Sequence, residues 1–345
     1  MAPSSELSVG VIGCGYWGPN LIRNFSSVKG WKVKYICDLN QARLQQVHEQ
    51  FPWAEPVTDV RLLFDDPTLD AVAIATPVSS HHSLAVTALN AGKHVLVEKP
   101  LAASVAEARE IVRVAEEKQR VLLVDHTFIY TPAVRKIKEI VDSGELGDLL
   151  YFDSVRINLG LFQHDINVIW DLAPHDFSIM DYLFPDKPIA ASASGMCHFG
   201  NQEDVAYVTA FFKKNIIAHF HVNWLSPVKI RTILIGGSRR MIVYDDMQNS
   251  EKVKVYDRGV DVVDSIGGIY SILVQYRMGD MYSPKLDTKE ALRAEVEHFK
   301  ECIEKGQTPV TDGRMGLRVV ELLEAAQRSL DQKGVRVPIE TSSNS

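Results

Sequence analysis

The sequence predicts an α/β protein with two domains: first a doubly wound parallel sheet, then an α/β domain built on a large, open, mostly antiparallel sheet. Three observations support this fold class. Strand and helix patterns alternate through the first third of the chain, which is typical of a parallel sheet with helices on both faces. A glycine-rich loop follows the first apolar run. From Ile189 onward, extended runs succeed one another with little helix between them, as in an antiparallel meander.

The length and composition limit the class of protein. A chain of 345 residues is long enough for two domains, and 46% hydrophobic with 23% charged residues is globular composition with a large core. The net charge of -7 argues against nucleic acid or an anionic membrane as the main partner. The four cysteines lie far apart and form no Cys-x-x-Cys pair, so we expect neither a disulfide framework nor a structural zinc site. The sequence shows no secretion signal and no apolar run of membrane-spanning length, and we therefore expect a soluble, cytoplasmic protein.

The elements of the first domain follow from apolar runs and helix signals. One helix starts near Leu21, and the helix from Ser83 to Asn90 should end at Gly92, a standard stop signal. Ser104 and Glu107 form a capping box that opens another helix. The predicted strands cover residues 7–12, 33–37, 71–75, 94–97 and 121–124, with a short one at Val57.

The pattern changes after Asp125, which divides the chain into a domain of residues 1–126 and a domain of residues 127–345. The second domain begins with a helix over 132–141 and a strand over 149–159. Its next helix is predicted to begin near Asp171, because Pro174 is acceptable only in the first turn of a helix. The expected meander strands cover 189–198, 205–212, 216–224, 229–235, 241–244 and 253–256, and two helices over 289–304 and 316–330 end the chain.

The run Gly13-Cys14-Gly15-Tyr16-Trp17-Gly18 is a G-x-G-x-x-G loop in the context that a dinucleotide site requires. A strand precedes the loop, a helix follows it, and Asp38 stands about twenty residues on, directly after the second strand. The glycines allow backbone N–H groups to approach a pyrophosphate at a helix N-terminus, as in a Rossmann domain. The alternative interpretation is an ordinary glycine turn with an aspartate helix cap.

Asp38 favours NAD over NADP as the cofactor. Its carboxylate can accept a hydrogen bond from a ribose 2′-hydroxyl and would repel a 2′-phosphate. No arginine follows it directly, and Arg43 is the nearest one. We therefore expect NAD to bind at least about tenfold more tightly than NADP.

Two further strand ends carry polar residues that belong at the ligand-binding edge of a parallel sheet. Thr76-Pro77 ends the fourth strand, with His81 beyond it, and this edge should face the nicotinamide half of a cofactor. Glu98-Lys99-Pro100 ends the next apolar run. A lysine here can stabilise the negative charge that develops on an alcohol oxygen during hydride removal. For His81 the alternative is a solvated histidine at a helix entry.

The second domain contributes a candidate acid/base pair in Trp170-Asp171-Leu172-Ala173-Pro174-His175. Asp171 and His175 are four residues apart, so their side chains can share one face of a helix. A histidine with a pKa near 6.5 can take or give a proton at neutral pH. The alternatives are an N-cap role for Asp171 and an ordinary surface or core position for His175.

With these motifs the chain resembles the Gfo/Idh/MocA oxidoreductases. The matching segments occur in the expected order: the Gly13 loop, Ala75-Thr76-Pro77 with His81, Ala91-Gly92-Lys93-His94-Val95 running into Glu98-Lys99-Pro100, and Asp171 with His175. The resemblance implies an N-terminal Rossmann domain and a C-terminal α/β domain with an open sheet. It also implies that Lys99 and His175 lie beside the nicotinamide with Asp171 close by, acting on a sugar hydroxyl or ketone.

We expect His175 to accept the proton, Lys99 to orient and polarise the alcohol, and Asp171 to position His175 or a substrate hydroxyl. Some members of the family have a tyrosine in place of the histidine, so the choice between His175 and Lys99 as proton acceptor stays open. The expected cofactor-binding residues are Gly13, Gly15, Tyr16, Trp17, Gly18, Asp38, Thr76, Pro77, His81, Glu98 and Lys99.

The substrate pocket should be lined by the strand and loop that precede the acid/base helix, where polar and aromatic side chains suit a sugar. The alternative is a polar loop. The segment from Leu161 to His175 resembles relatives that act on nucleotide-linked sugars, whereas Asp125-His126-Thr127-Phe128 replaces an arginine-rich stretch that many relatives carry. The expected substrate-binding residues are Lys99, Arg156, Asn158, Gln163, Asn167, Trp170, Asp171 and His175, with His164 as a further donor.

One predicted strand has two different faces. His219 and His221 alternate on one face, but no third ligand is evident, so we expect a polar sheet surface and no metal site. Phe220, Val222 and Trp224 form the apolar face, which we expect to be an exposed subunit contact. Because the family commonly buries this sheet between subunits, we expect a homodimer or homotetramer through the C-terminal sheet.

The leading interpretation is an NAD-dependent oxidoreductase that moves a hydride between nicotinamide and a secondary alcohol or ketone of a sugar, in particular a nucleotide-linked sugar. One alternative is an enzyme that keeps NAD bound and uses it transiently for glycoside cleavage or epimerisation, which net NADH release would distinguish. Another is a non-catalytic NAD-binding sensor, against which the presence of Lys99, Asp171 and His175 argues. The identity of the sugar, the carbon oxidised and the physiological direction do not follow from the sequence.

Overall fold

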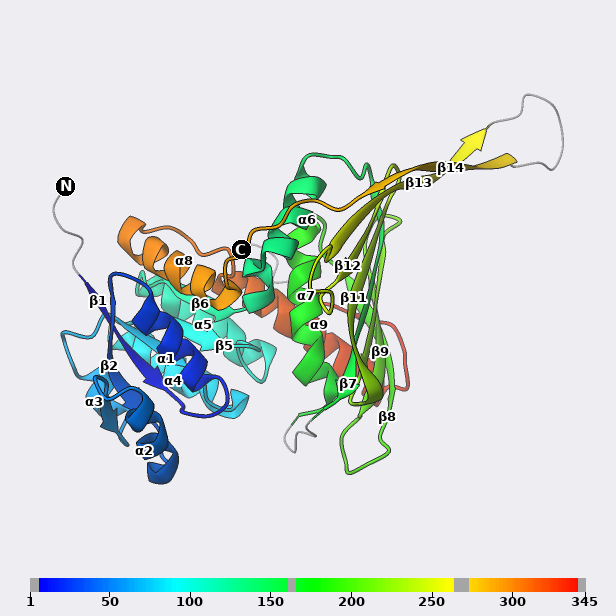
Figure 1. Cartoon of the computed structure of the whole chain (residues 1–345). Coiled ribbons are helices and arrows are strands. Elements are labelled where there is room, and N and C mark those ends of the chain that lie inside the picture. The colour runs from blue at the N-terminus through cyan, green and yellow to red at the C-terminus, as the bar shows by residue number, and fades with distance from the viewer. Residues whose placement is uncertain (1–5, 161–165, 264–272, 341–345) are drawn as a thin grey trace. The chain divides into compact units, whose positions relative to one another are not determined.

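The computed structural model describes residues 6–160, 166–263 and 273–340. The chain divides into two units (Figure 1). Unit 1 comprises Met1–Thr131 and Lys289–Glu321, and unit 2 comprises Pro132–Thr288 and Leu322–Ser345. Within the described residues, no helix combines the length and the apolar character that crossing a membrane requires.

A six-stranded parallel sheet forms the centre of unit 1, which confirms the predicted doubly wound domain. The strand order is β3-β2-β1-β4-β5-β6, so the direction of winding reverses between β1 and β4. Ligands bind at such a reversal, outside the carboxyl ends of the strands. The strands are β1 (Leu7–Ile12), β2 (Trp31–Cys37), β3 (Glu55–Val57), β4 (Ala71–Ile74), β5 (His94–Glu98) and β6 (Leu122–Asp125).

Helices connect these strands, and the predicted start and stop residues are found at the ends of two of them. Ser104 caps its helix by accepting the Glu107 N–H at 3.3 Å. Gly92 ends the preceding helix segment with a positive φ of 78°, which favours glycine. The helices of unit 1 are α1 (Gly18–Ser27), α2 (Gln41–Gln50), α3 (Arg61–Phe64), α4 (His81–Asn90), α5 (Val105–Glu117) and α8 (Ala291–Lys305), with 3₁₀ turns η1 (Val78–Ser80) and η2 (Thr127–Tyr130).

The structure corrects the predicted domain boundaries, because residues 289–321 belong to unit 1 and not to the C-terminal domain. Helix α8 packs its apolar face on the core of unit 1. Phe299 stacks on Trp31 with ring centroids 5.7 Å apart, and the Trp31 indole N–H donates to the Val296 carbonyl at 3.2 Å. The sequence places this helix almost 300 residues after the start of the chain, and only the burial of its apolar face on Trp31 assigns it to the first unit.

Unit 2 is built on a nine-stranded sheet in the order β14-β13-β12-β11-β7-β10-β9-β8-β15. Among the strand pairs that the described residues form in this sheet, only β7 and β10 are parallel, so the predicted mostly antiparallel sheet is confirmed. Figure 1 shows β13 and β14 running on beyond the other strands as a two-stranded ribbon. The strands are β7 (Leu149–Leu159), β8 (Ala190–Met196), β9 (Val205–Phe211), β10 (Ile217–Asn223), β11 (Leu225–Gly237), β12 (Met241–Asp245), β13 (Val253–Val263), β14 (Leu273–Tyr282) and β15 (Val337–Pro338).

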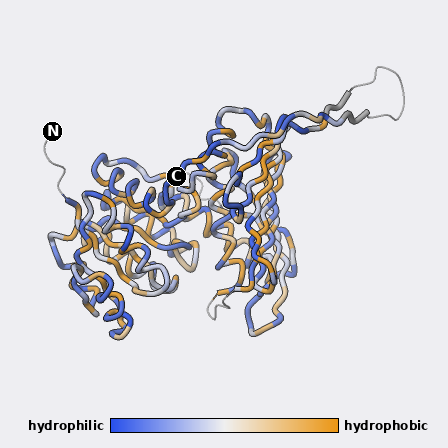
Figure 2. Tube along the Cα trace, in the orientation of Figure 1, coloured by the Kyte–Doolittle hydropathy of each residue, from blue (hydrophilic) through white to orange (hydrophobic). Residues whose placement is uncertain are grey.

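Helices cover one face of this sheet, and Figure 2 shows apolar residues recurring along its strands. The helices are α6 (Pro132–Asp142), α7 (Val168–Leu183) and α9 (Gly313–Asp331), the last of which begins in unit 1 and ends in unit 2. Helix α7 packs on β10, where the rings of Phe177 and Phe220 meet at 4.7 Å in a nearly perpendicular pair. Such a pair adds about 1 kcal/mol beyond the area that it buries.

The packing of α7 corrects the expected face of subunit contact. Phe220, Val222 and Trp224 are buried at 1% exposure or less, so the apolar face of β10 is already covered by the chain itself. The opposite face carries His219 and His221. Both imidazoles stack on Tyr207 of β9, with the His221 centroid 4.5 Å from that ring.

Helix α7 starts three residues earlier than predicted. Asn167 is its N-cap, with a side-chain oxygen that accepts the N–H groups of Ile169 at 3.1 Å and Trp170 at 3.2 Å. Pro174 therefore lies inside the helix rather than in its first turn. A proline there removes one backbone hydrogen bond, at a cost of about 3 kcal/mol. Val168 and Ile169 are fully buried, and their burial offsets most of this cost.

Candidate functional site

The three glycines of the loop after β1 occupy positions with different steric requirements. Gly13 has a φ of +99°, and a Cβ there would lie 2.5 Å from the Ala75 carbonyl oxygen. A Cβ at Gly18 would lie 2.1 Å from the Gly13 carbonyl oxygen. No atom lies within 4 Å of a Cβ placed at Gly15. Gly13 and Gly18 are thus required by the fold, whereas the open space at Gly15 leaves room for a ligand to approach the backbone.

Asp38 holds this loop from the end of β2. One carboxylate oxygen accepts the Cys14 N–H at 2.7 Å, and the other accepts the Asn40 N–H at 2.8 Å. Both bonds are charge-assisted, since the acceptor is a carboxylate. The carboxylate stays half-buried, at the strand end next to the glycine loop. The predicted juxtaposition of loop and acid is therefore present in the structure.

The start of α1 is open to an anion. Its N-cap is Trp17, which provides no side-chain cap, and its first turn contains no acidic residue. The positive end of the helix dipole suits a phosphate. Tyr16 and Trp17 form a perpendicular ring pair at 5.7 Å, and Tyr16 is 84% exposed. Open glycine, carboxylate and uncapped helix end together fit the pyrophosphate and ribose of a dinucleotide.

Cys14 fills space in this loop. Its side chain is 2% exposed, and burial raises the pKa of its thiol to about 12. A thiol with so high a pKa is not a nucleophile at neutral pH. The helix N-terminus therefore does not activate Cys14, which fills space beside the loop.

The structure corrects the expectation that His81 contacts the cofactor. Its ring is 1% exposed, with Nδ1 2.9 Å from the Pro100 carbonyl oxygen and Nε2 2.8 Å from the Thr76 carbonyl oxygen. Burial lowers the pKa of this imidazole. His81 therefore ties the turn after β4, which includes Thr76 and Pro77, to the turn after β5.

Glu98 and Lys99 occupy opposite kinds of environment at the end of β5. Glu98 is 7% exposed, and its Oε2 accepts the backbone N–H of Lys99 at 3.1 Å. Lys99 is half-buried and is followed by Pro100, with a cis peptide bond between them. Glu98 was expected to bind the cofactor; in the structure it is buried and supports the Lys99 turn from inside unit 1.

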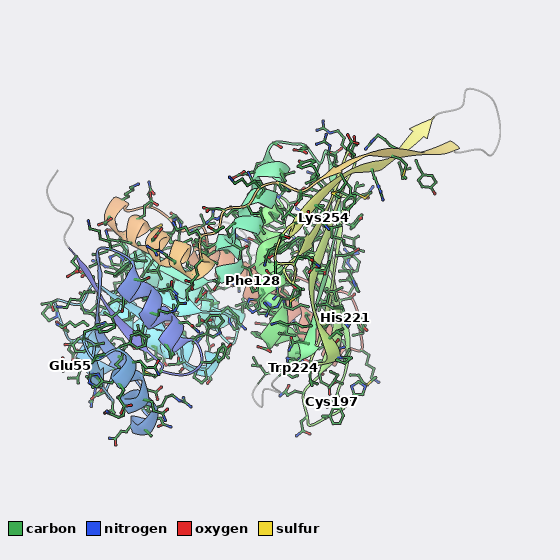
Figure 3. The ribbon with its side chains drawn as sticks, in the orientation of Figure 1. Glu55, Phe128, Cys197, His221, Trp224 and Lys254 are labelled. Atoms are coloured by element: carbon green, nitrogen blue, oxygen red, sulfur yellow. The ribbon has the colours of Figure 1, made fainter. Side chains whose placement is uncertain are left out.

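Asp171 is held in place by the sheet of unit 2. The indole N–H of Trp224 donates to its Oδ2 at 3.0 Å; Trp224, labelled in Figure 3, lies between β10 and β11 in the chain. Asp171 lies in the first turn of α7, and the N-cap of that helix is Asn167, so Asp171 is not the cap. His175 follows one turn later and is half-buried. The carboxylate is thus oriented by a fixed donor, as a positioning group requires.

Asn158 lies near Trp224, the donor to this carboxylate, and Trp170 directly precedes Asp171 in the chain. A Cβ at Gly160 would lie 2.9 Å from the Trp224 ring and 3.0 Å from the Asn158 amide nitrogen, so these groups converge on Gly160. Asn158 and Trp170 are both half-buried, as residues at a pocket wall are. The structure therefore keeps Asn158, Trp170, Asp171 and His175 as substrate-binding candidates.

Arg156 is corrected from a substrate ligand to a structural residue. It is 3% exposed, and its guanidinium contacts Asp176 of α7 through two nitrogens, at 2.7 Å and 3.0 Å. The Ser154 hydroxyl donates to the same carboxylate at 2.6 Å. The neighbouring carboxylate raises the pKa of Arg156 against the opposing effect of burial. This ion pair fastens α7, and hence Asp171 and His175, to the sheet.

Asn167 is likewise structural. Besides capping α7, its amide nitrogen donates to Glu203 and Gln327, each at 2.8 Å. At 3% exposure it has no surface to offer a substrate. Gln163 and His164 lie outside the described residues.

Several residues important for the site were not identified from the sequence. Trp224 and Asp176 orient Asp171 and Arg156, and Asp125 and Glu295 are buried carboxyls of unit 1. A signal existed for Asp125, which ends β6 opposite Glu98 at the end of β5. Glu295 gave none, because an acidic residue on an amphipathic helix usually faces water. Among the described residues, no group of three His, Cys, Asp or Glu side chains could hold a metal ion.

The chain matches two family models. The oxidoreductase family with an NAD-binding Rossmann fold matches residues 7–126, and the Gfo/Idh/MocA C-terminal domain matches residues 134–243. The UDP-N-acetylglucosamine 3-dehydrogenase of Acidithiobacillus ferrooxidans is 27% identical over 319 residues, covering 91% of this chain and 94% of that protein. The NAD⁺-dependent scyllo-inositol 2-dehydrogenase of Bacillus subtilis is 25% identical, with 88% of each chain covered.

A solved structure has the same fold. A levoglucosan dehydrogenase in complex with NADH and levoglucosan superimposes with a TM-score of 0.83 at 20% identity, covering 97% of this chain and 100% of that one. The glycine loop, the strand-end acid and the two-unit architecture agree with both matched models. The chain therefore belongs to the Gfo/Idh/MocA oxidoreductase family, with its NAD-binding Rossmann domain at residues 7–126.

Proposed function

We propose that this protein is an NAD-dependent dehydrogenase that oxidises a secondary hydroxyl of a nucleotide-linked sugar, or reduces the corresponding ketone. The observation that carries the proposal is the position of Lys99, directly after the carboxyl end of β5. The glycine loop and Asp38 follow the carboxyl ends of β1 and β2 in the same parallel sheet. That edge is where a parallel sheet of this order binds its ligand. The relative named UDP-N-acetylglucosamine 3-dehydrogenase supports the nucleotide-linked class.

NAD would supply the hydride acceptor for this oxidation. The open backbone at Gly15 and the uncapped start of α1 suit its pyrophosphate, and Asp38 suits the adenosine ribose. The carboxylate of Asp38 disfavours a 2′-phosphate by like-charge repulsion, which supports NAD over NADP.

In the proposed reaction His175 takes the hydroxyl proton while Lys99 stabilises the charge that develops on the alcohol oxygen. Asp171, which the Trp224 indole fixes at 3.0 Å, orients the imidazole or a substrate hydroxyl. If Lys99 and His175 act on one alcohol, the effects of Lys99→Ala and His175→Ala on kcat will not be additive. Fully additive losses would assign the two residues to separate steps.

The deciding experiment mixes the purified protein with NAD and a panel of sugars and nucleotide sugars, and follows nicotinamide absorbance. We expect net NADH with at least one nucleotide-linked sugar, and a kcat/KM at least about tenfold lower for the corresponding free sugar. Lys99→Ala should abolish turnover, whereas Lys29→Ala, at an exposed position of the same unit, should not. Binding of NAD without net NADH from any member of the panel would instead indicate transient use of the cofactor or a sensor.

We also propose that the sheet of unit 2 joins subunits through its outer face, opposite α7. Tyr207, Ile217 and Leu234 expose 42%, 46% and 38% of their surface there. Apolar exposure of this kind marks contact surfaces. Light scattering coupled to size-exclusion chromatography should give the molar mass of a dimer or tetramer. The Leu234→Glu variant should give a lower molar mass than wild-type. A monomer at micromolar concentration would exclude this interface.

A further inference from the structure

Three carboxyl groups meet in the interior of unit 1, directly inside the Lys99 turn. Glu98 at the end of β5 and Asp125 at the end of β6 are register partners in the parallel sheet. Glu295 of α8 is buried close enough to interact with both Asp125 and Glu98, although it lies far from them in the chain. Their exposures are 7%, 2% and 0%. Buried carboxyl groups this close together cannot all be ionised.

The three groups interact with one another. The Asp125 carboxyl lies close enough to act on both Glu98 and Glu295, and the Thr127 hydroxyl donates to Asp125. Among the described residues, neither carboxyl oxygen of Glu295 has a hydrogen-bond partner of ordinary geometry. One oxygen of Asp125, Oδ2, also lacks such a partner. Unsatisfied buried carboxylates cost several kcal/mol each, whereas a carboxylic acid can donate to its neighbour. The geometry therefore calls for protons between these oxygens.

The electrostatics agree with this geometry. Burial, then the charge of Asp125, raises the pKa of Glu98 well above its usual value, although Lys99 acts in the opposite sense. Burial and the same aspartate also raise the pKa of Glu295, with Glu98 adding to the effect. Lys99 is a charged neighbour of the cluster, and the titratable side chain of His126, next to Asp125 in the chain, is also buried.

We propose that Glu98, Asp125 and Glu295 form a proton-holding cluster that supports the Lys99 turn, and that Glu295 is a positioning residue for Lys99. Glu98 transmits the effect, since its Oε2 accepts the Lys99 N–H at 3.1 Å. With protons shared in the cluster, Glu98 stays fixed and the ammonium of Lys99 is not neutralised from inside. Its charge then remains available to the alcohol oxygen. This role rests on the proposed function of Lys99, whereas the proton content of the cluster does not.

The proton content is tested by stability as a function of pH, which needs no substrate. Glu295→Gln mimics the protonated acid. Above about pH 4.5 the unfolded wild-type chain releases the Glu295 proton while the folded protein keeps it, so wild-type stability falls with rising pH and the variant does not share that loss. The Tm of Glu295→Gln minus the Tm of wild-type should therefore increase as the pH is raised from about 5 toward about 8.

The matched control is Glu301→Gln on the same helix. Glu301 is exposed and pairs with Lys305, which lowers its pKa, so it is ionised in both folded and unfolded states across this range. Its Tm difference from wild-type should stay flat. A flat difference for Glu295→Gln as well would overturn the proton-holding cluster.

The positioning role is tested by two further measurements. Glu295→Gln should keep a kcat near that of wild-type, while Glu295→Met, which fills the same volume without polar atoms, should lower kcat about tenfold or more with little change in the Kd for NAD. Equal kcat in both variants would refute the positioning role. The pH dependence of Lys99 methylation, read by peptide mass, should be the same in Glu295→Gln and wild-type, and a shift would show that Glu295 is ionised. If no sugar is oxidised, the proposed function fails, but the Tm and methylation results still decide the state of the cluster.

Discussion

Replacing Asp38 by asparagine tests the cofactor site through a single change of charge. The two carboxylate oxygens of Asp38 accept the N–H groups of Cys14 and Asn40, at 2.7 Å and 2.8 Å. Asparagine has one acceptor oxygen, and its amide NH₂ is a donor. One backbone N–H will therefore face another donor, and the remaining hydrogen bond will lose its charge.

The structure gives the size of this effect. A hydrogen bond to a charged group contributes about 1.5–3 kcal/mol, and the half-buried position of Asp38 favours the lower end of that range. We expect Asp38→Asn to lower the free energy of unfolding by about 2 kcal/mol. A lost bond to the ribose of NAD should weaken NAD binding about tenfold or more. NADP should lose no such bond and should gain from the removed repulsion, so the preference for NAD falls by at least about tenfold.

Calorimetric titration of NAD and of NADP into wild-type and variant measures the preference, and urea unfolding measures the stability. Asp65→Asn is the matched control, because it removes the same charge from an exposed position of unit 1. The reasoning fails if Asp38→Asn keeps the wild-type ratio of the two dissociation constants. An unchanged free energy of unfolding would show that the bonds to the Cys14 and Asn40 N–H groups do not stabilise the loop.

Three other predictions follow from the same structure. Gly15→Ala should leave the Tm without cofactor unchanged and weaken NAD binding, whereas Gly18→Ala should lower the Tm itself, because only the second Cβ meets backbone, at 2.1 Å; equal Tm values for the two variants would contradict this division. Asp176→Asn should cost about 3–5 kcal/mol in urea unfolding, since it leaves Arg156 charged and buried without its carboxylate, and a loss below about 1 kcal/mol would count against a structural ion pair. Burial lowers the pKa of His94 to about 4, so between about pH 6.5 and about pH 4 the unfolded chain binds a proton that the folded chain does not, and stability falls as the pH is lowered. His94→Gln should flatten the slope of Tm against pH in this range, and an unchanged slope would assign the acid sensitivity to other groups.

Much of the cofactor site was predictable because its signals are local. A strand, a glycine loop and a helix that follow directly in sequence can place a phosphate-binding turn, and Asp38 needed only its position after the second strand. The same logic failed for α7. Pro174 pointed to a helix start near Asp171, but burial of Val168 and Ile169 and the cap at Asn167 extend the helix past that signal.

The failures among the site residues have one physical origin. The residues concerned are polar and lie in segments next to the ligand site: Arg156, Asn167, His81 and Glu98. The sequence does not distinguish a polar side chain that faces the ligand from one that faces the protein interior. Each instead meets a buried partner, such as Asp176 for Arg156. The identity of that partner depends on contacts across tens or hundreds of residues, which periodicity does not contain.

The sequence by itself determined the two sheet architectures, the glycine loop with its acid, and the strand end that carries Lys99, because strand alternation, turn chemistry and apolar periodicity act over a few neighbouring residues. Tertiary structure alone decided that α8 belongs to unit 1, that the apolar face of β10 is covered by α7, and that Glu295 joins Glu98 and Asp125. These outcomes depend on which surfaces of the chain pack against each other and are removed from water. Burial is a property of the assembled chain, and the same carboxyl group is an ordinary surface acid or a held proton according to what packs around it.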